Sequence, residues 1–144
     1  MRHPKEIKLT ARMREALNGL DAKVFLDDDL MFVLNDENSV RNFVPDLQKI
    51  SEVLEGMGFT ITAREKNYDF VSRTFFPKLK INEDPVCGSA HCNFIPYWAK
   101  ELGKTKMKAY QASSRGGELL CELCGDRVHI SGKAALYSVC DIFC

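Results

Sequence analysis

The segment from Gly88 to Leu102 constrains the fold of this chain more than any other part of the sequence. Apolar side chains lie around most of its helical circumference rather than in one stripe: Ala90, Cys92, Phe94, Ile95, Tyr97, Trp98, Ala99 and Leu102. A helix that is apolar on all sides must be enclosed by the rest of the protein. Pro96 removes one backbone hydrogen bond, which predicts a local kink near residues 92–96.

The flanking sequence predicts short strands and two amphipathic helices. Aromatic and β-branched runs predict strands at 59–63, 69–76, 107–111, 118–123, 127–131 and 134–139, and a hairpin joining 23–26 to 30–34 through an aspartate turn. Apolar spacing predicts helices at 7–17 and 47–54. We therefore expect an α+β fold, in which a curled, mixed, barrel-like β-sheet wraps around a central buried helix and the amphipathic helices lie outside. A chain of 144 residues should form a single domain, 1–144.

Composition excludes several classes of function. Twenty basic residues balance twenty acidic ones, so the chain lacks the positive charge that nucleic acid selects (Lys+Arg 20, Asp+Glu 20). Its apolar runs are far shorter than the roughly 20 residues that cross a bilayer, and the first residues do not resemble a secretory signal. We therefore expect a cytoplasmic protein with no membrane or nucleic-acid partner, whose six cysteines are reduced thiols rather than a disulfide framework.

Reactive groups concentrate just before the enclosed helix, in residues 82–92. A helix N-terminus carries unpaired N–H groups and positive potential, which favour a carboxylate or an oxyanion. Gly88 permits close approach of a ligand, Ser89 can donate a hydrogen bond, and the helix dipole should lower the pKa of Cys87. Asp84 could hold or protonate a substrate group. The alternative is that Asp84 and Ser89 only cap the helix and that Cys87 is a small core residue.

Three stretches of sequence resemble a known family. Residues 72–104 (SRTFFPKLKINEDPVCGSAHCNFIPYWAKELGK), 109–123 (AYQASSRGGELLCEL) and 125–134 (GDRVHISGKA) are similar to the C-terminal half of PhzF-like, or phenazine biosynthesis-like, isomerases and epimerases. Weaker similarity covers about residues 9–139. The family has the diaminopimelate-epimerase-like fold, in which two similar halves each curl a sheet around a central helix. The resemblance implies that this chain is one such half.

The resemblance also implies roles for individual residues. Asp84 and Ser89 match the aspartate and serine that line the family's substrate site, and Gly88 matches its backbone donor. Cys87 is similar to the acid/base cysteine of racemase and epimerase relatives. The family's proton-abstracting glutamate belongs to the N-terminal half, outside this match, and Lys80-Ile81 departs from the usual Gly-Ile. We expect catalytic roles for Asp84, Cys87 and Ser89, and substrate contacts from Gly88, Ser89, Ala90, Arg115 and Gly116.

Other motifs have competing interpretations. Arg115-Gly116-Gly117 could clamp a carboxylate, but a turn between two strands requires the same glycines. His91 could pair with Cys87 for catalysis, although a local hydrogen bond is the favoured interpretation. Cys121 and Cys124 imitate half of a zinc knuckle, yet a second ligand pair would need unconventional spacing. We therefore expect neither a metal nor an organic cofactor.

The leading hypothesis is a cofactor-independent isomerase that moves a proton on a small-molecule carboxylate substrate. The missing half of the site would come from a homodimer or from a separately encoded N-terminal half, because an isolated half leaves its helix mouth exposed. Two other functions remain open: a non-catalytic binding or assembly module that retains the fold, and a zinc-stabilised domain.

Overall fold

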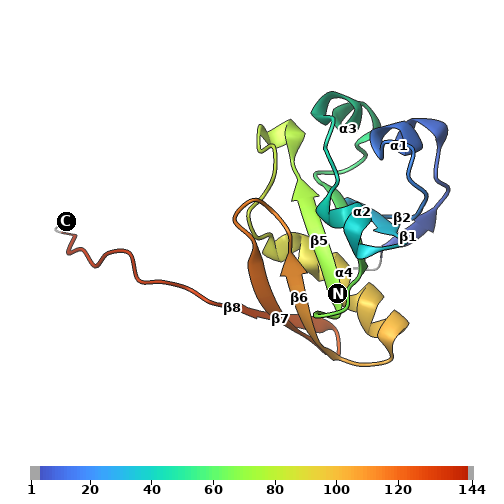
Figure 1. The fold of residues 1–144 in the computed structure, drawn as a ribbon. Helices are drawn as coiled ribbons and strands as arrows, with labels where there is room; N and C mark the ends of the chain where they lie inside the picture. The colour runs from blue at the N-terminus through green and yellow to red at the C-terminus, as the bar shows by residue number, and fades with distance from the viewer. Residues whose placement is uncertain (1–3, 143–144) are drawn as a thin grey trace.

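The computed structural model describes residues 4–142, which form one eight-stranded sheet with helices on both faces (Figure 1). The strands are β1 (Lys5–Ile7), β2 (Ala22–Leu26), β3 (Leu30–Leu34), β4 (Phe59–Arg64), β5 (Phe70–Phe75), β6 (Lys106–Gln111), β7 (Gly117–Cys124) and β8 (Arg127–Gly132). The helices are α1 (Ala11–Ala16), α2 (Glu37–Arg41), α3 (Leu47–Val53), the 3₁₀ turn η1 (Pro77–Leu79) and α4 (Gly88–Leu102).

Strand order follows the chain from β1 to β8. All neighbouring pairs are antiparallel except β3–β4 and β5–β6, which are parallel. A parallel pair needs a long crossover. The first crossover contains α2 and α3, and the second contains η1 and α4. The sheet is therefore mixed, as expected, and it curls as an open sheet rather than closing on itself.

The helix α4 packs against one face of this sheet and is the central helix that the sequence predicts. Its core residues include Phe94, Ile95 and Trp98, which pack with Met31 of β3 and with residues of β5, β6 and β7. The Trp98 Nε1–H donates to Thr62 Oγ1 on β4 over 3.0 Å, so its polar atom is satisfied inside the core. Pro96 lies inside α4, and the helix continues beyond it.

The helices α1, α2 and α3 cover the other face of the sheet, as Figure 1 shows. Alternation along the strands separates the two layers, since Leu30, Phe32 and Leu34 of β3 face these outer helices while Met31 and Val33 face α4. The predicted helix at 47–54 is α3, with Asp46 as its N-cap. The described chain contains no helix of the length and apolarity that spanning a bilayer requires.

One predicted element starts later than expected, and another is wrong. The N-terminal helix begins only at Ala11, where Thr10 caps it, because residues 5–7 instead pair with β2 as strand β1. The strand predicted at 134–139 does not form. Among residues 4–142, β8 remains the edge strand of the sheet, and the segment after it pairs with no strand and runs away from the body of the protein (Figure 1). The sequence patterns also did not predict α2, a short helix capped by Asp36.

Candidate active site at the N-terminus of α4

A cavity of about 330 Å³ opens where α4 begins. Three of the predicted site residues line it, namely Asp84, Cys87 and Ser89. The rest of its wall comes from the β2–β3 turn and from the segments around α3 and η1, through Asp28, Asp29, Met57, Phe76, Leu79 and Ile81. Asp84, Cys87 and Ser89 therefore share one cavity at the start of α4, whereas Gly88 lines a neighbouring one.

Buried polar side chains hold the loop that carries Asp84. Arg73 on β5 forms a bidentate ion pair with Glu83, at 2.6 and 3.0 Å, and also donates to the backbone oxygen of Phe43. The Asp84 N–H donates to Thr74 O over 2.9 Å. Two-pronged guanidinium–carboxylate pairs fix direction as well as distance. The loop before α4 is therefore anchored to β5.

Gln111, a fully buried residue of β6, ties together both ends of the site loop. Its Nε2 donates to Asp84 O over 2.6 Å, and its Oε1 accepts the Cys87 N–H over 2.8 Å. A buried amide that uses both its donor and its acceptor in this way specifies one loop conformation. Residues 84–87 are consequently set by a side chain that lies well beyond them in the sequence.

The Cys87 side chain is buried, with 5% exposure, and its Sγ lies 3.2 Å from Ser89 Oγ. Burial raises the pKa of the Cys87 thiol, and hydrogen bonds from Ser89 and the Ala90 N–H only partly oppose that rise. The expectation that the helix dipole lowers this pKa is therefore wrong, because desolvation of the thiolate outweighs the dipole. The expectation that Cys92 points into the core is also wrong, since Cys92 is partly exposed.

His91 lies inside the core and is not placed for nucleophilic catalysis. Its Nδ1–H donates to Cys87 O over 2.6 Å, one turn back along α4. Burial lowers the pKa of His91 to about 4, so the ring is neutral at physiological pH. Its Nε2 is buried without a hydrogen-bond partner among the described residues. This geometry agrees with the local hydrogen bond favoured by the sequence rather than with a Cys–His pair.

The β2–β3 turn contributes two aspartates to this cavity, although their sequence pattern indicates only a turn. Asp28 and Asp29 line the cavity, and Asp29 is 3% exposed. Asn93 of α4 approaches Asp29 Oδ2 with its Nδ2 at 3.5 Å. A buried amide on an otherwise apolar helix was the available signal, because such a group needs a polar partner. Asp29 and Asp84 bring carboxyl groups to this cavity from segments far apart in the sequence.

A second cavity, of about 670 Å³, brings Gly88 together with Arg115 and Gly116. Gly116 has φ +70°, and a Cβ there would collide with the hydroxyl of Tyr110. A Cβ on Gly117 would meet Val86. The structure of the turn therefore explains why both positions are glycine. It gives no structural reason for the exposed Arg115. A Cβ on Gly88, in contrast, would enter open space.

Ala90 occupies a different position from the other predicted substrate contacts. Its side chain is fully buried in the core beneath α4 and lines neither cavity. Only its N–H reaches the helix mouth, at the Cys87 thiol. A contact between the Ala90 side chain and a substrate is thus inconsistent with the structure, because the methyl group points inward.

The proposed zinc knuckle does not form. Cys121 is 3% exposed and packs against the α4 core, where burial raises its pKa to about 12. Cys124 lies three residues further along the same strand and therefore on the opposite face. Two thiols on opposite faces of a sheet cannot bind one metal ion.

A curled sheet around one helix, with a cavity containing carboxyl groups at the start of that helix, defines the class of this protein. Residues 6–139 match the PhzC-PhzF family model, described as phenazine biosynthesis-like protein. The chain belongs to this phenazine biosynthesis-like family, as the sequence motifs indicate.

Individual relatives support the same assignment. The chain is 47% identical over 123 residues to an uncharacterized isomerase of Pseudomonas aeruginosa, covering 85% of this chain and 47% of that protein. A second uncharacterized isomerase of the same organism is 45% identical over 136 residues, covering 93% and 51%. A crystal structure of a PhzF-family protein from Enterococcus faecalis superimposes with a TM-score of 0.89 at 48% identity, covering 94% of this chain and 52% of that one. The chain therefore spans about half the length of these relatives.

Proposed function

We propose that this chain supplies one half of the active site of a cofactor-independent isomerase, which moves a proton on a small carboxylate substrate. The observation that carries the proposal is the cavity at the start of α4, where Asp84, Cys87 and Ser89 line one space beside a helix N-terminus. Relatives named as isomerases support the reaction class.

The first turn of α4 is suited to hold the substrate carboxylate. The N-cap residue Cys87 makes no standard side-chain cap hydrogen bond, and the first turn of α4 contains no acidic residue. The N–H groups of this first turn and the helix dipole then favour an anion. The exposed Ser89 hydroxyl can add a hydrogen bond, and the open space beside Gly88 lets the ligand approach the backbone.

The raised pKa of Cys87 suits a proton donor. At neutral pH its thiol is protonated, so it can give its proton to a substrate carbon after a base on the completing half has removed a proton elsewhere on the substrate. The electron pair moves within the substrate and the thiol proton forms the new C–H bond. Ser89 and the Ala90 N–H stabilise the resulting thiolate, and exchange with water restores both groups. Asp84 orients the substrate.

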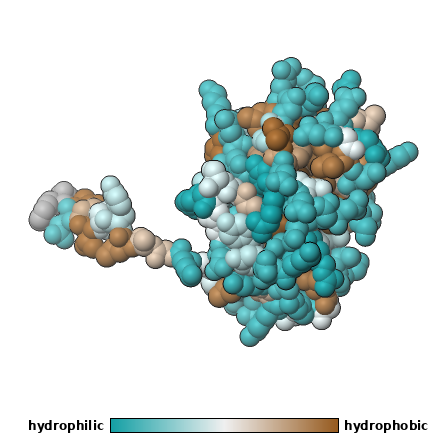
Figure 2. Space-filling model, viewed as in Figure 1, coloured by the Kyte–Doolittle hydropathy of each residue, from teal (hydrophilic) through white to brown (hydrophobic). Residues whose placement is uncertain are grey.

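The completing half is a second copy of this chain or a separately encoded N-terminal half. Binding of such a half is consistent with the exposed apolar residues of the tail beyond β8: Leu136, Tyr137, Val139 and Ile142. Figure 2 shows this apolar segment projecting from a largely hydrophilic body. In an isologous dimer, two α4 N-termini would face each other across the axis. Sedimentation at micromolar concentration tests this arrangement, which a stable monomer would contradict.

The reaction is tested by deuterium incorporation from heavy water into carbon-bound positions of amino acids and cyclohexadiene carboxylic acids. We expect exchange with one substrate class, and a loss of about 10²-fold or more in Asp84→Asn and in Cys87→Ala. The matched control Asp21→Asn alters only an exposed ion pair with Arg14 and should retain full exchange. Equal rates in Asp84→Asn, Cys87→Ala and the parent chain would refute the assignment. Absence of exchange by the dimer with every substrate would favour a non-catalytic module.

A further inference from the structure

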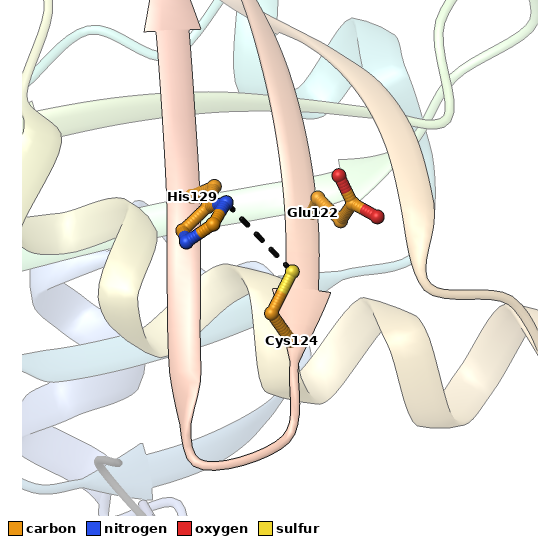
Figure 3. Close-up of side chains that lie close together, drawn as sticks. All are labelled: Glu122, Cys124 and His129. Atoms are coloured by element: carbon orange, nitrogen blue, oxygen red, sulfur yellow. Dashed lines mark hydrogen bonds between the residues drawn. The ribbon is translucent and has the colours of Figure 1, made fainter.

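A second group of reactive side chains lies on the β7–β8 hairpin, outside the cavity at α4. Glu122, Cys124 and His129 place a carboxylate oxygen, a thiol sulfur and a ring nitrogen within 4.8 Å of one another. Figure 3 shows the three side chains on the same face of the hairpin. Glu122 and Cys124 are half-buried and His129 is exposed, so the group is open to solvent on one side.

The backbone of the hairpin produces this grouping. Glu122 lies directly opposite His129 in the register, and Cys124 follows on the same face at the diagonal position. A two-residue turn with Gly125 at φ +58° closes the hairpin, which matches a type II′ turn. Alternate residues such as Cys121 point to the core instead. The strand register therefore brings the three side chains together on one face of the hairpin.

The distances fit one metal ion. Cys124 Sγ and His129 Nδ1 are 3.8 Å apart. Two such atoms bound tetrahedrally to zinc would be separated by about 3.6 Å, given Zn–S near 2.3 Å and Zn–N near 2.05 Å. The thiol and the imidazole therefore need to move by only a few tenths of an ångström. Glu122 has three side-chain torsions with which to bring its carboxylate to the third position.

We propose that Glu122, Cys124 and His129 form a three-residue binding site for Zn²⁺. One thiolate, one imidazole and one carboxylate are donors that this borderline-soft cation prefers. The thiolate and the carboxylate together carry two negative charges, which balance the ion. Three protein ligands leave a fourth position for water or an external ligand.

The surroundings of the site leave that fourth position accessible. Glu122 and His129 line a surface hollow of about 570 Å³, together with Asp69 and residues of β6. Lys106 lies 3.6 Å from one Glu122 oxygen in an exposed ion pair, which is weak enough to yield to a metal. This ligand set differs from the Cys121–Cys124 knuckle, and the proposal departs from the expectation that the chain binds no metal.

The test is titration of the reduced full chain with Co²⁺ and with Zn²⁺. Cobalt should produce an intense thiolate-to-metal absorption band and the visible bands of a tetrahedral site, at one equivalent per chain. Zinc should displace it. Cys124→Ser and His129→Gln should each weaken zinc binding by at least about tenfold, since loss of even an outer-shell partner costs 10–100-fold. Both residues lie on the outer face of the hairpin, and circular dichroism confirms that each variant is folded.

The controls are Cys92→Ser and Cys140→Ser, which remove thiols outside the hairpin and should bind zinc like the parent chain. Unchanged affinity in both Cys124→Ser and His129→Gln would overturn the proposal, as would the absence of a thiolate band. Loss of the band in Cys140→Ser alone would assign the metal to the tail and also overturn it.

Discussion

Removal of the buried amide of Gln111 tests how far the site loop depends on β6. In the parent chain, Gln111 bonds the Cys87 N–H over 2.8 Å and the Asp84 carbonyl over 2.6 Å. Gln111→Leu nearly keeps the side-chain volume but removes both hydrogen bonds. An unpaired buried donor costs about 1–3 kcal/mol, and the part-buried carbonyl lies near the lower end of that range, which gives roughly 2–4 kcal/mol in all. This is a large share of the ~5–15 kcal/mol that stabilises a domain.

The assay is urea unfolding followed by the fluorescence of Trp98, with Gln48→Leu on the exposed face of α3 as the matched control. We expect the free energy of unfolding to fall by roughly 2–4 kcal/mol for Gln111→Leu and almost not at all for the control. Gln111→Glu keeps the acceptor for Cys87 but opposes a carboxylate to Asp84 O, so it should be destabilised as well. Stability of Gln111→Leu within about 0.5 kcal/mol of the parent would show that Gln111 does not hold the site loop.

Two further predictions follow from buried titratable groups. Because burial lowers the pKa of His91 from 6.5 to about 4, the unfolded chain binds the extra proton first as pH falls, and stability should drop by about 3 kcal/mol between these pH values. The free energy of unfolding, measured across that pH range, should lose this pH dependence in His91→Leu and keep it in the control His129→Asn. An unchanged pH dependence in His91→Leu would contradict the attribution to His91. Iodoacetamide should alkylate Cys92 faster than Cys87 at neutral pH, since Cys87 is buried with a raised pKa, and mass spectrometry of the two peptides would expose a reversed order.

The sequence predicted the central helix and its polar mouth because both depend on local patterns. The all-round apolar run of 88–102 can only be enclosed, and the residues before it are tied to it by adjacency. Local patterns did not predict β1, which pairs with β2, and they predicted a strand at 134–139 that pairs with nothing, since pairing is not encoded in the strand itself.

The chemistry of the site was less predictable than its location. The pKa of Cys87 depends on how deeply Sγ is buried, which the helix dipole argument could not include. Asp29 reaches the cavity from β2–β3 only because the sheet curls, and Gln111 holds the loop from β6. The proposed metal-ligand set on the hairpin likewise depends on the register that places Glu122 opposite His129. Each of these depends on tertiary neighbours rather than on sequence spacing.

The parallel pairing of β5 with β6 has a consequence for the order in which the protein folds. Phe70 pairs with Ala109, so the whole site loop and α4 lie within the segment that must close before this contact forms. Closing such a segment costs chain entropy before the sheet repays it. Until β6 docks, Gln111 cannot reach Asp84 or Cys87. The hydrogen bonds that set the site loop can therefore form only after β6 has paired with β5.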